Sequence, residues 1–110
     1  MTIRIPDSHV EHAFEVLKSQ KHAAARAGYE FAEKQLKVVL AKAELQANGK
    51  TVGERQASAL ASPEYERALN DFRLVAETYH SERDRRDAAV AIIDAWRTQQ
   101  SDLRSMGRVG

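Results

Sequence analysis

Basic side chains are the residues whose spacing most clearly suggests a binding chemistry. Lys18, His22 and Arg26 recur at intervals of four, which places them on one face of a helix. The segment HSERDRRD at residues 80–87 adds three arginines. Such a row can follow a phosphate backbone by electrostatic attraction and counterion release, without reading the bases. We therefore predict that nucleic acid or a partner contacts Lys18, Lys21, Arg26, Lys34, Lys37, Arg83, Arg85 and Arg86.

The same charges have a second interpretation as a solvated helix face. Glu82 and Arg86 stand four residues apart, as do Arg83 and Asp87, and pairs at this spacing neutralise each other on a helix. The chain has 17 Lys and Arg against 16 Asp and Glu, so its net charge of +1 creates no general attraction to nucleic acid or membrane. The charges alone favour the solvated face, with DNA contact as the alternative.

Residues that could carry catalysis or hold a metal do not form a complete set. His9 and His12 lie three positions apart, which could begin a metal site, but the sequence ties no further ligand to them. His80 has acidic neighbours at the spacing of a surface arrangement. The Asn-Gly-Lys-Thr segment at 48–51 has the last letters of a phosphate-binding loop but lacks its first glycine and strand. We expect no enzyme activity, catalytic residue, metal or cofactor.

Composition limits where the protein works. The chain has no cysteine, which excludes disulfides, thiolate metal sites and cysteine nucleophiles. The first residues, MTIRIPDSH, contain no apolar segment of signal-peptide length. No run approaches the roughly 20 apolar residues that span a bilayer. We therefore expect a soluble cytoplasmic protein without membrane contact.

Helices are the elements predicted to position these side chains. A capping box at residues 8–11 begins the first, and apolar residues then recur every seventh position from Val10 to Leu45. Asn48-Gly49 ends this helix. A second capping box at 51–54 begins a short helix, and Pro63 suits the first turn of another. The signals predict one all-α domain, residues 1–110, with helices at 9–47, 52–60 and 63–104 and a frayed tail at 105–110.

The two long helices are predicted to form an antiparallel hairpin of coiled-coil type, because the connector between them is short. Facing residue numbers then sum to about 110. Phe31 would face Tyr79, and the polar segment at 80–87 would lie opposite Ala24 and Gly28, which leave room for arginine stems. The predicted core and oligomer seam consists of Phe14, Leu17, Phe31, Val38, Tyr65, Phe72, Tyr79, Ile93 and Trp96.

Apolar residues outside this seam need a further surface. They are Leu36, Val39, Leu40, Leu74, Val90 and Ile92. Two helices cannot cover both flanks, so the sequence predicts a homo-oligomer, with a dimer of hairpins forming a four-helix bundle as the simplest arrangement. The alternative is a monomer in which the short helix covers one flank.

Several short motifs lie in the second half of the chain. They are E-R at 54–55, A-S-x-E-Y at 61–65, A-L-x-x-F at 68–72, R-R-x-A-A at 85–89 and I-x-x-W-R-T at 93–98. With them, residues 53–104 resemble an uncharacterised family of small helical proteins of tailed phages and prophages. Its members are encoded near recombination and replication genes, including those of single-strand annealing and single-strand binding proteins. The resemblance implies no activity and no functional residues.

These observations predict a non-enzymatic, oligomeric helical accessory protein of phage DNA recombination or replication, acting through nucleic-acid or protein contacts in the bacterial host cytoplasm. Its expected partners are a second copy of itself, single-stranded or duplex DNA, or a phage recombination protein. The alternative is a structural adaptor, or an inhibitor of a host protein, that does not bind nucleic acid.

Overall fold

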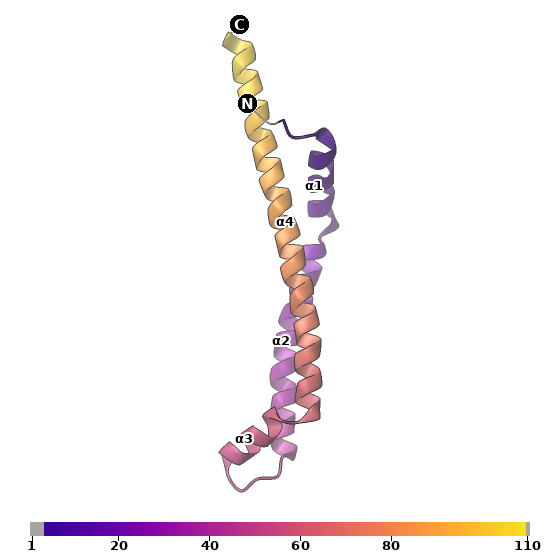
Figure 1. The fold of residues 1–110 in the computed structure, drawn as a ribbon, viewed down its shortest axis with the longest axis vertical. Coiled ribbons are helices and arrows are strands. Elements are labelled where there is room, and N and C mark those ends of the chain that lie inside the picture. Colours follow the sequence, from indigo (N-terminus) through magenta and orange to yellow (C-terminus); the bar gives the residue numbers. More distant parts are fainter. Residues whose placement is uncertain (1–3, 110) are drawn as a thin grey trace. The chain divides into compact units, whose positions relative to one another are not determined.

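The computed structural model describes residues 4–109, which form helices and no strands (Figure 1). In chain order the elements are α1 (Asp7–Ser19), α2 (Lys21–Gln46), α3 (Val52–Leu60) and α4 (Pro63–Val109). The predicted all-α fold is confirmed, and α2 and α4 are the arms of a hairpin connected through α3. Within the described residues, none of the helices combines the length and apolar character that a membrane span requires.

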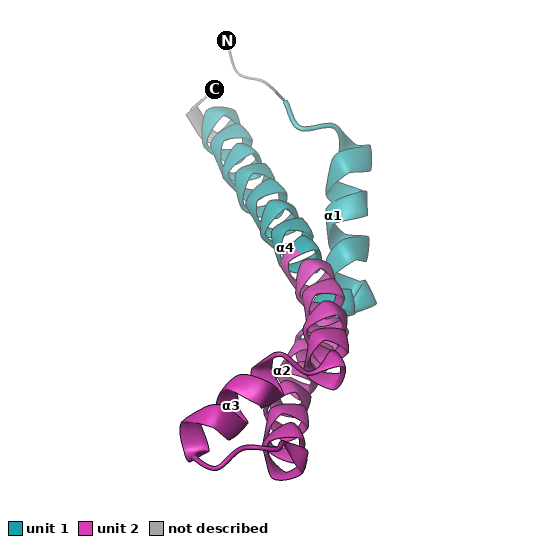
Figure 2. Cartoon of the chain, turned by 60° about the horizontal axis from the view of Figure 1, so that its bottom comes forward, with its two compact units in different colours: residues 1–22, 81–110 teal, residues 23–80 magenta. Residues whose placement is uncertain are grey.

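The chain divides into two compact units (Figure 2). Unit 1 comprises residues 1–22 and 81–110, and unit 2 comprises residues 23–80. The second boundary, between His80 and Ser81, falls at the start of the polar segment 80–87. Residues 81–87 are all polar or charged, so this stretch of α4 contributes no apolar side chain to either unit.

The first predicted helix, 9–47, is wrong as a continuous element, because Gln20 adopts a left-handed backbone with φ 55° and ψ 22°. The Ser19 hydroxyl donates to the Val16 carbonyl at 2.7 Å and accepts from the Lys21 amide at 3.4 Å. Serine side chains that bond to the nearby backbone compete with the helical ladder. Glutamine seldom adopts the left-handed conformation, and no glycine or proline stands at this position. The residue types at the break therefore do not predict it.

The ends of α3 and α4 follow the predicted capping chemistry. The Thr51 hydroxyl accepts from the Glu54 amide at 3.1 Å, and the Glu54 carboxylate accepts from the Lys50 amide at 2.8 Å. The prediction of a helix at 52–60 is therefore confirmed. The Ser62 hydroxyl accepts from the Tyr65 amide at 3.3 Å, at the start of α4. The predicted end at residue 104 is wrong, because α4 continues to Val109 without a helix-breaking proline.

The core of unit 1 lies between α1 and the later part of α4. Ala13, Ala89 and Ile93 are buried there, and Phe14 and Leu17 pack against them. The rings of Phe14 and Trp96 meet edge to face, with centroids 6.3 Å apart, which is the facing pair that the sequence predicts. Small alanine side chains allow the two backbones to approach closely, and the larger residues seal the edges.

In unit 2 the face of α2 that packs on α4 is not the predicted one. The main row of its half-buried residues stands at positions 25, 29, 32, 36, 39 and 43, and positions 22, 40 and 44 are half-buried too. The predicted seam residues Phe31 and Val38 are instead 68% and 45% exposed, and Leu45, in the same row, is 87% exposed. Before the break Val10 and Ala13 are buried and Leu17 is half-buried, and a continuous helix would extend this row to positions 24, 28 and 31. The buried phase therefore moves by one residue across Gln20.

The predicted facing residues in unit 2 are corrected in the same way. Tyr29, not Phe31, packs against Tyr79. A methyl group added at Gly28 would meet Val75 at 3.9 Å, so Gly28 lies opposite this part of α4 and not opposite residue 82. The predicted seam residues Tyr65, Phe72 and Tyr79 on α4 are half-buried, as expected. One side of the predicted seam is thus right and the other is displaced.

Replacing Gln20 by glycine tests the break between α1 and α2, because the sign of the change in the free energy of unfolding depends on the backbone conformation at this residue. A non-glycine residue in the left-handed region costs about 1–2 kcal/mol, and the larger unfolded-state entropy of glycine offsets about 0.5–1 kcal/mol of that. We expect Gln20→Gly to raise the free energy of unfolding in urea by about 0.5–1 kcal/mol. Inside a continuous helix, the same change would lower it by a similar amount. His12→Gly, at an exposed position within α1, is the control and should be destabilising.

Candidate interaction surfaces

The predicted basic residues are exposed, but they do not belong to one unit. Unit 1 contains Lys18, Lys21, Arg83, Arg85 and Arg86, and unit 2 contains Arg26, Lys34 and Lys37. On α4, Arg83 and Arg85 are two positions apart, which turns their side chains about 200° from each other around the helix. No single helix face therefore presents all the arginines of the segment 80–87.

Every arginine in the predicted set has a carboxylate beside it. The pairs are Arg26 with Glu30 at 3.1 Å, Arg83 with Asp84 at 3.8 Å, Arg85 with Glu82 at 3.9 Å and Arg86 with Asp87 at 3.2 Å. The two pairs predicted at a spacing of four in this segment, Glu82 with Arg86 and Arg83 with Asp87, are replaced by closer neighbours. Each positive charge is thus partly neutralised within its own helix, which weakens the segment as a phosphate-binding patch.

The four lysines of the predicted set differ from the arginines. Lys18, Lys21, Lys34 and Lys37 make no ion pair with any residue in the described part of the chain. Their ammonium groups are exposed, so they remain available to an anion. Of the basic side chains predicted from the sequence, these are the ones best suited to contact phosphate.

Metal ligands do not gather in the part of the chain that the structure describes. His9 and His12 are exposed on α1, and no group of three or more histidine, cysteine, aspartate or glutamate side chains is placed there to hold an ion. His80 instead lies beside aromatic rings, 5.3 Å from the ring centre of Tyr79 and 6.0 Å from that of Tyr29.

Tyr29 is the residue that the sequence analysis missed. Its ring stacks on Tyr79 with centroids 4.9 Å apart and tilts against Phe72 at 5.4 Å. These contacts are the largest aromatic cluster in unit 2, and they connect α2 to α4. The signal was present in the sequence, because Tyr29 belongs with Leu36 and Val39 to a row with spacing of three and four.

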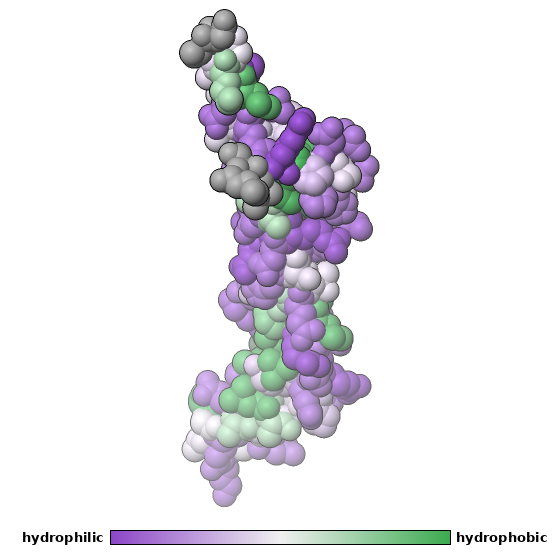
Figure 3. Space-filling model, turned by 45° about the horizontal axis from the view of Figure 1, so that its top comes forward, coloured by the Kyte–Doolittle hydropathy of each residue, from purple (hydrophilic) through white to green (hydrophobic). Residues whose placement is uncertain are grey.

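An apolar groove lies between α2 and α4 in unit 2. Its volume is about 600 Å³. The residues that line it are Gly28, Phe31, Ala32, Gln35, Leu36, Val39, Glu64, Arg67, Ala68, Asp71, Phe72 and Val75. Figure 3 shows hydrophobic atoms, in green, gathered on the surface in the lower part of the view, where the elements of unit 2 lie. Such a surface is larger than scattered single apolar residues and is typical of an interaction site.

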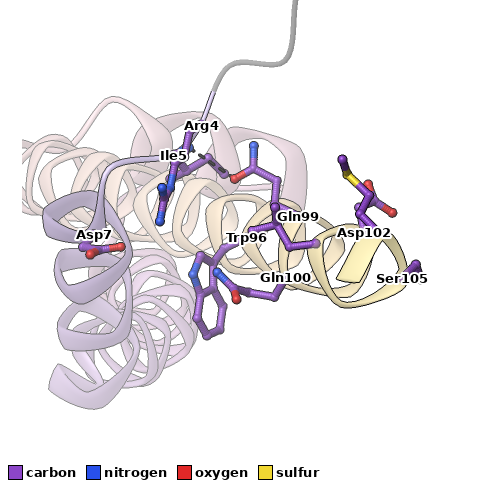
Figure 4. A pocket seen from close by; sticks show the side chains of 10 residues that line it. Arg4, Ile5, Asp7, Trp96, Gln99, Gln100, Asp102 and Ser105 are labelled. Atoms are coloured by element: carbon purple, nitrogen blue, oxygen red, sulfur yellow. Dashed lines mark hydrogen bonds between the residues drawn. The ribbon is translucent and has the colours of Figure 1, made fainter. Parts of the chain in front are cut away.

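A second hollow, of about 670 Å³, lies in unit 1 (Figure 4). The chain segment before α1 contributes Arg4 and Ile5, and α4 contributes Trp96 and Gln99. The Ile5 amide donates to the Gln99 side-chain oxygen at 3.2 Å, which ties this segment to α4. Its walls combine apolar surface with amides, a chemistry that suits binding and offers no arranged nucleophile and base among the described residues.

Comparisons with protein-family models, curated proteins and solved structures find no match to this chain.

The aromatic cluster predicts unequal effects for two neighbouring aromatic residues. Tyr29→Ala removes the contacts to Tyr79 and Phe72, and we expect it to lower the free energy of unfolding by about 2 kcal/mol or more. Phe31→Ala should cost less than about 1 kcal/mol, because 68% of this residue is already exposed. Urea denaturation at low protein concentration measures both. If Phe31→Ala lowers the free energy of unfolding more than Tyr29→Ala does, Phe31 faces α4 as the sequence predicts, and the register described above is wrong.

Proposed function

We propose that this protein is a non-enzymatic helical accessory protein that works through protein contacts. The observation that carries the proposal is the incomplete burial of unit 2. Of its residues 23–80, only Ala59 is buried, whereas the large apolar side chains of α2 are half-buried or exposed. A hairpin with so little enclosed surface is stabilised when a partner covers its apolar faces.

The outer face of α2 is the surface offered to such a partner. Phe31, Val38 and Leu45 recur every seventh position, which places them along one side of the helix. Covering an exposed side chain of this size contributes about 1.5–3 kcal/mol. An amphipathic helix or groove on the partner that covers Val38 and Leu45, which lie outside the groove between α2 and α4, would gain enough for specific binding.

The resemblance of residues 53–104 to small phage proteins supports a more specific setting. We propose that the partner is a phage recombination or replication protein, such as a single-strand annealing or single-strand binding protein. In this setting the chain is an adaptor that holds such a protein without touching the nucleic acid. The local neutralisation of Arg83, Arg85 and Arg86 supports this preference for protein over DNA.

Titration against a purified phage single-strand annealing protein, and then against a single-strand binding protein, tests this proposal. We expect saturable binding to one of them, and Leu45→Glu should weaken it about tenfold or more, since the lost burial exceeds about 1.4 kcal/mol. Leu103→Glu, the same change at a leucine of unit 1 that is 52% exposed, is the matched control and should leave binding unchanged. Absence of binding to both proteins, or equal weakening by the two variants, would contradict the proposal.

The four lysines that lack ion pairs with described residues favour a second candidate function, direct DNA contact. Lys18 and Lys21 lie in unit 1, and Lys34 and Lys37 lie in unit 2. Contacts of this kind release counterions, so the binding they produce weakens steeply as salt is raised.

Labelled single-stranded and duplex DNA, titrated at about 50 mM and about 200 mM salt, separates the two functions. For an adaptor that binds only protein, we expect no saturable binding even at the lower salt. Binding at about 50 mM that is lost on changing the four lysines to alanine, yet kept when Arg83, Arg85 and Arg86 are changed, would establish the second function instead. The triple arginine variant is the control because it removes nearly as much charge.

A further inference from the structure

The groove of unit 2 has features that suit one particular occupant. Its floor includes Ala32, Leu36 and Val39 of α2, and Phe72 and Val75 of α4. We propose that a second copy of this chain binds in this groove, so that two hairpins form a four-helix bundle. This inference rests on the proposed function as a protein that acts by protein contacts, and it names a partner for a surface distinct from the one at Leu45.

The exposed area of the chain is consistent with a stable dimer. The chain exposes 8553 Å², whereas a folded monomer of 12.3 kDa typically exposes about 6,100 Å². The excess of about 2,400 Å² on each copy is larger than the roughly 800 Å² per partner that a standard protein interface buries. The chain therefore has more exposed area than a standard dimer interface needs.

The groove is lined by one large exposed ring and by residues with little or no side chain. Phe31 lines it with 68% of its surface exposed, and Gly28 and Ala32 line it too. A methyl group at Gly28 would make only an ordinary contact with Val75, at 3.9 Å, so packing within the unit does not require a glycine here. In a two-fold contact, residue i of one copy meets residue j of the other and the reverse. The Phe31 ring of each copy can then fill the depression at Gly28 and Ala32 of the other.

The charges at the rim also match a second copy. Glu64, Arg67 and Asp71 lie along the α4 side of the groove, and none of them makes an ion pair with a residue in the described part of the chain. A partner of a single charge sign would be repelled by part of this row. A second copy brings the same mixture of signs, so Arg67 of one copy can approach Asp71 or Glu64 of the other.

Analytical ultracentrifugation of the full chain, diluted from about 200 µM to about 1 µM, tests the assignment. We expect a monomer–dimer equilibrium in this range. Phe31→Glu should weaken the dimer at least tenfold, because it places a carboxylate in an apolar groove. Leu45→Glu, the same substitution on the same helix outside the groove, should leave the dimer unchanged. Far-ultraviolet circular dichroism verifies that both variants keep their helices.

A chain that remains monomeric at the highest concentration would overturn the proposal. So would a dimer that Phe31→Glu leaves intact, or one that Leu45→Glu weakens equally, since the contact would then lie on another surface. The partner titration with the recombination proteins is read separately. If the Phe31→Glu chain no longer dimerises but still binds a recombination protein, the proposed function stands. If the wild-type chain dimerises but binds neither recombination protein, the proposed function is overturned and the dimer is not.

Discussion

The stacking of Tyr29 on Tyr79, with Phe72 at its side, sets how α2 meets α4 in unit 2. These rings are the largest side chains at the facing positions, since the other half-buried positions of α2 include Ala25, Ala32 and Ala43. Once Tyr29 is the inner residue, the three-four spacing of the helix places Ala32, Leu36 and Val39 inward as well. The same spacing leaves Phe31 and Val38 on the far side, where α4 does not cover them.

Much of this fold can be predicted from the sequence wherever a local signal has one meaning. The Thr51 hydroxyl accepts from the Glu54 amide in the first turn of α3, and the Ser62 hydroxyl does the same for the Tyr65 amide of α4, so these boundaries agree closely. Most of the large apolar residues of α4 lie along a single face of the helix, so the residues that face α1 can be predicted. Phe14 packs against Trp96 as expected. In contrast, the left-handed conformation of Gln20 accompanies a hydrogen bond from the Ser19 hydroxyl to the Val16 carbonyl. The residue types at these positions do not predict that bond.

The inner face of α2 could not be chosen from the sequence, because this helix is apolar on two sides. One row contains Tyr29, Leu36 and Val39, and the other contains Phe31, Val38 and Leu45, with nearly the same spacing. The predicted basic site has a related difficulty. Spacing places arginines on a helix, but which carboxylate each one pairs with depends on rotamers, and the pairs in the segment 80–87 form with nearer residues than the preferred spacing suggests.

Two apolar faces on one helix have a physical consequence for what the protein can do. Leaving Phe31, Val38 and Leu45 in water sacrifices several kcal/mol of burial, at roughly 1.5–3 kcal/mol for each side chain. A sequence selected only to fold as an isolated hairpin would gain solubility from polar residues at these positions. In the proposed contacts, the groove beside Phe31 binds one partner and the row towards Leu45 binds another. The arrangement allows α2 to pack on α4 and still present a second apolar surface to a partner.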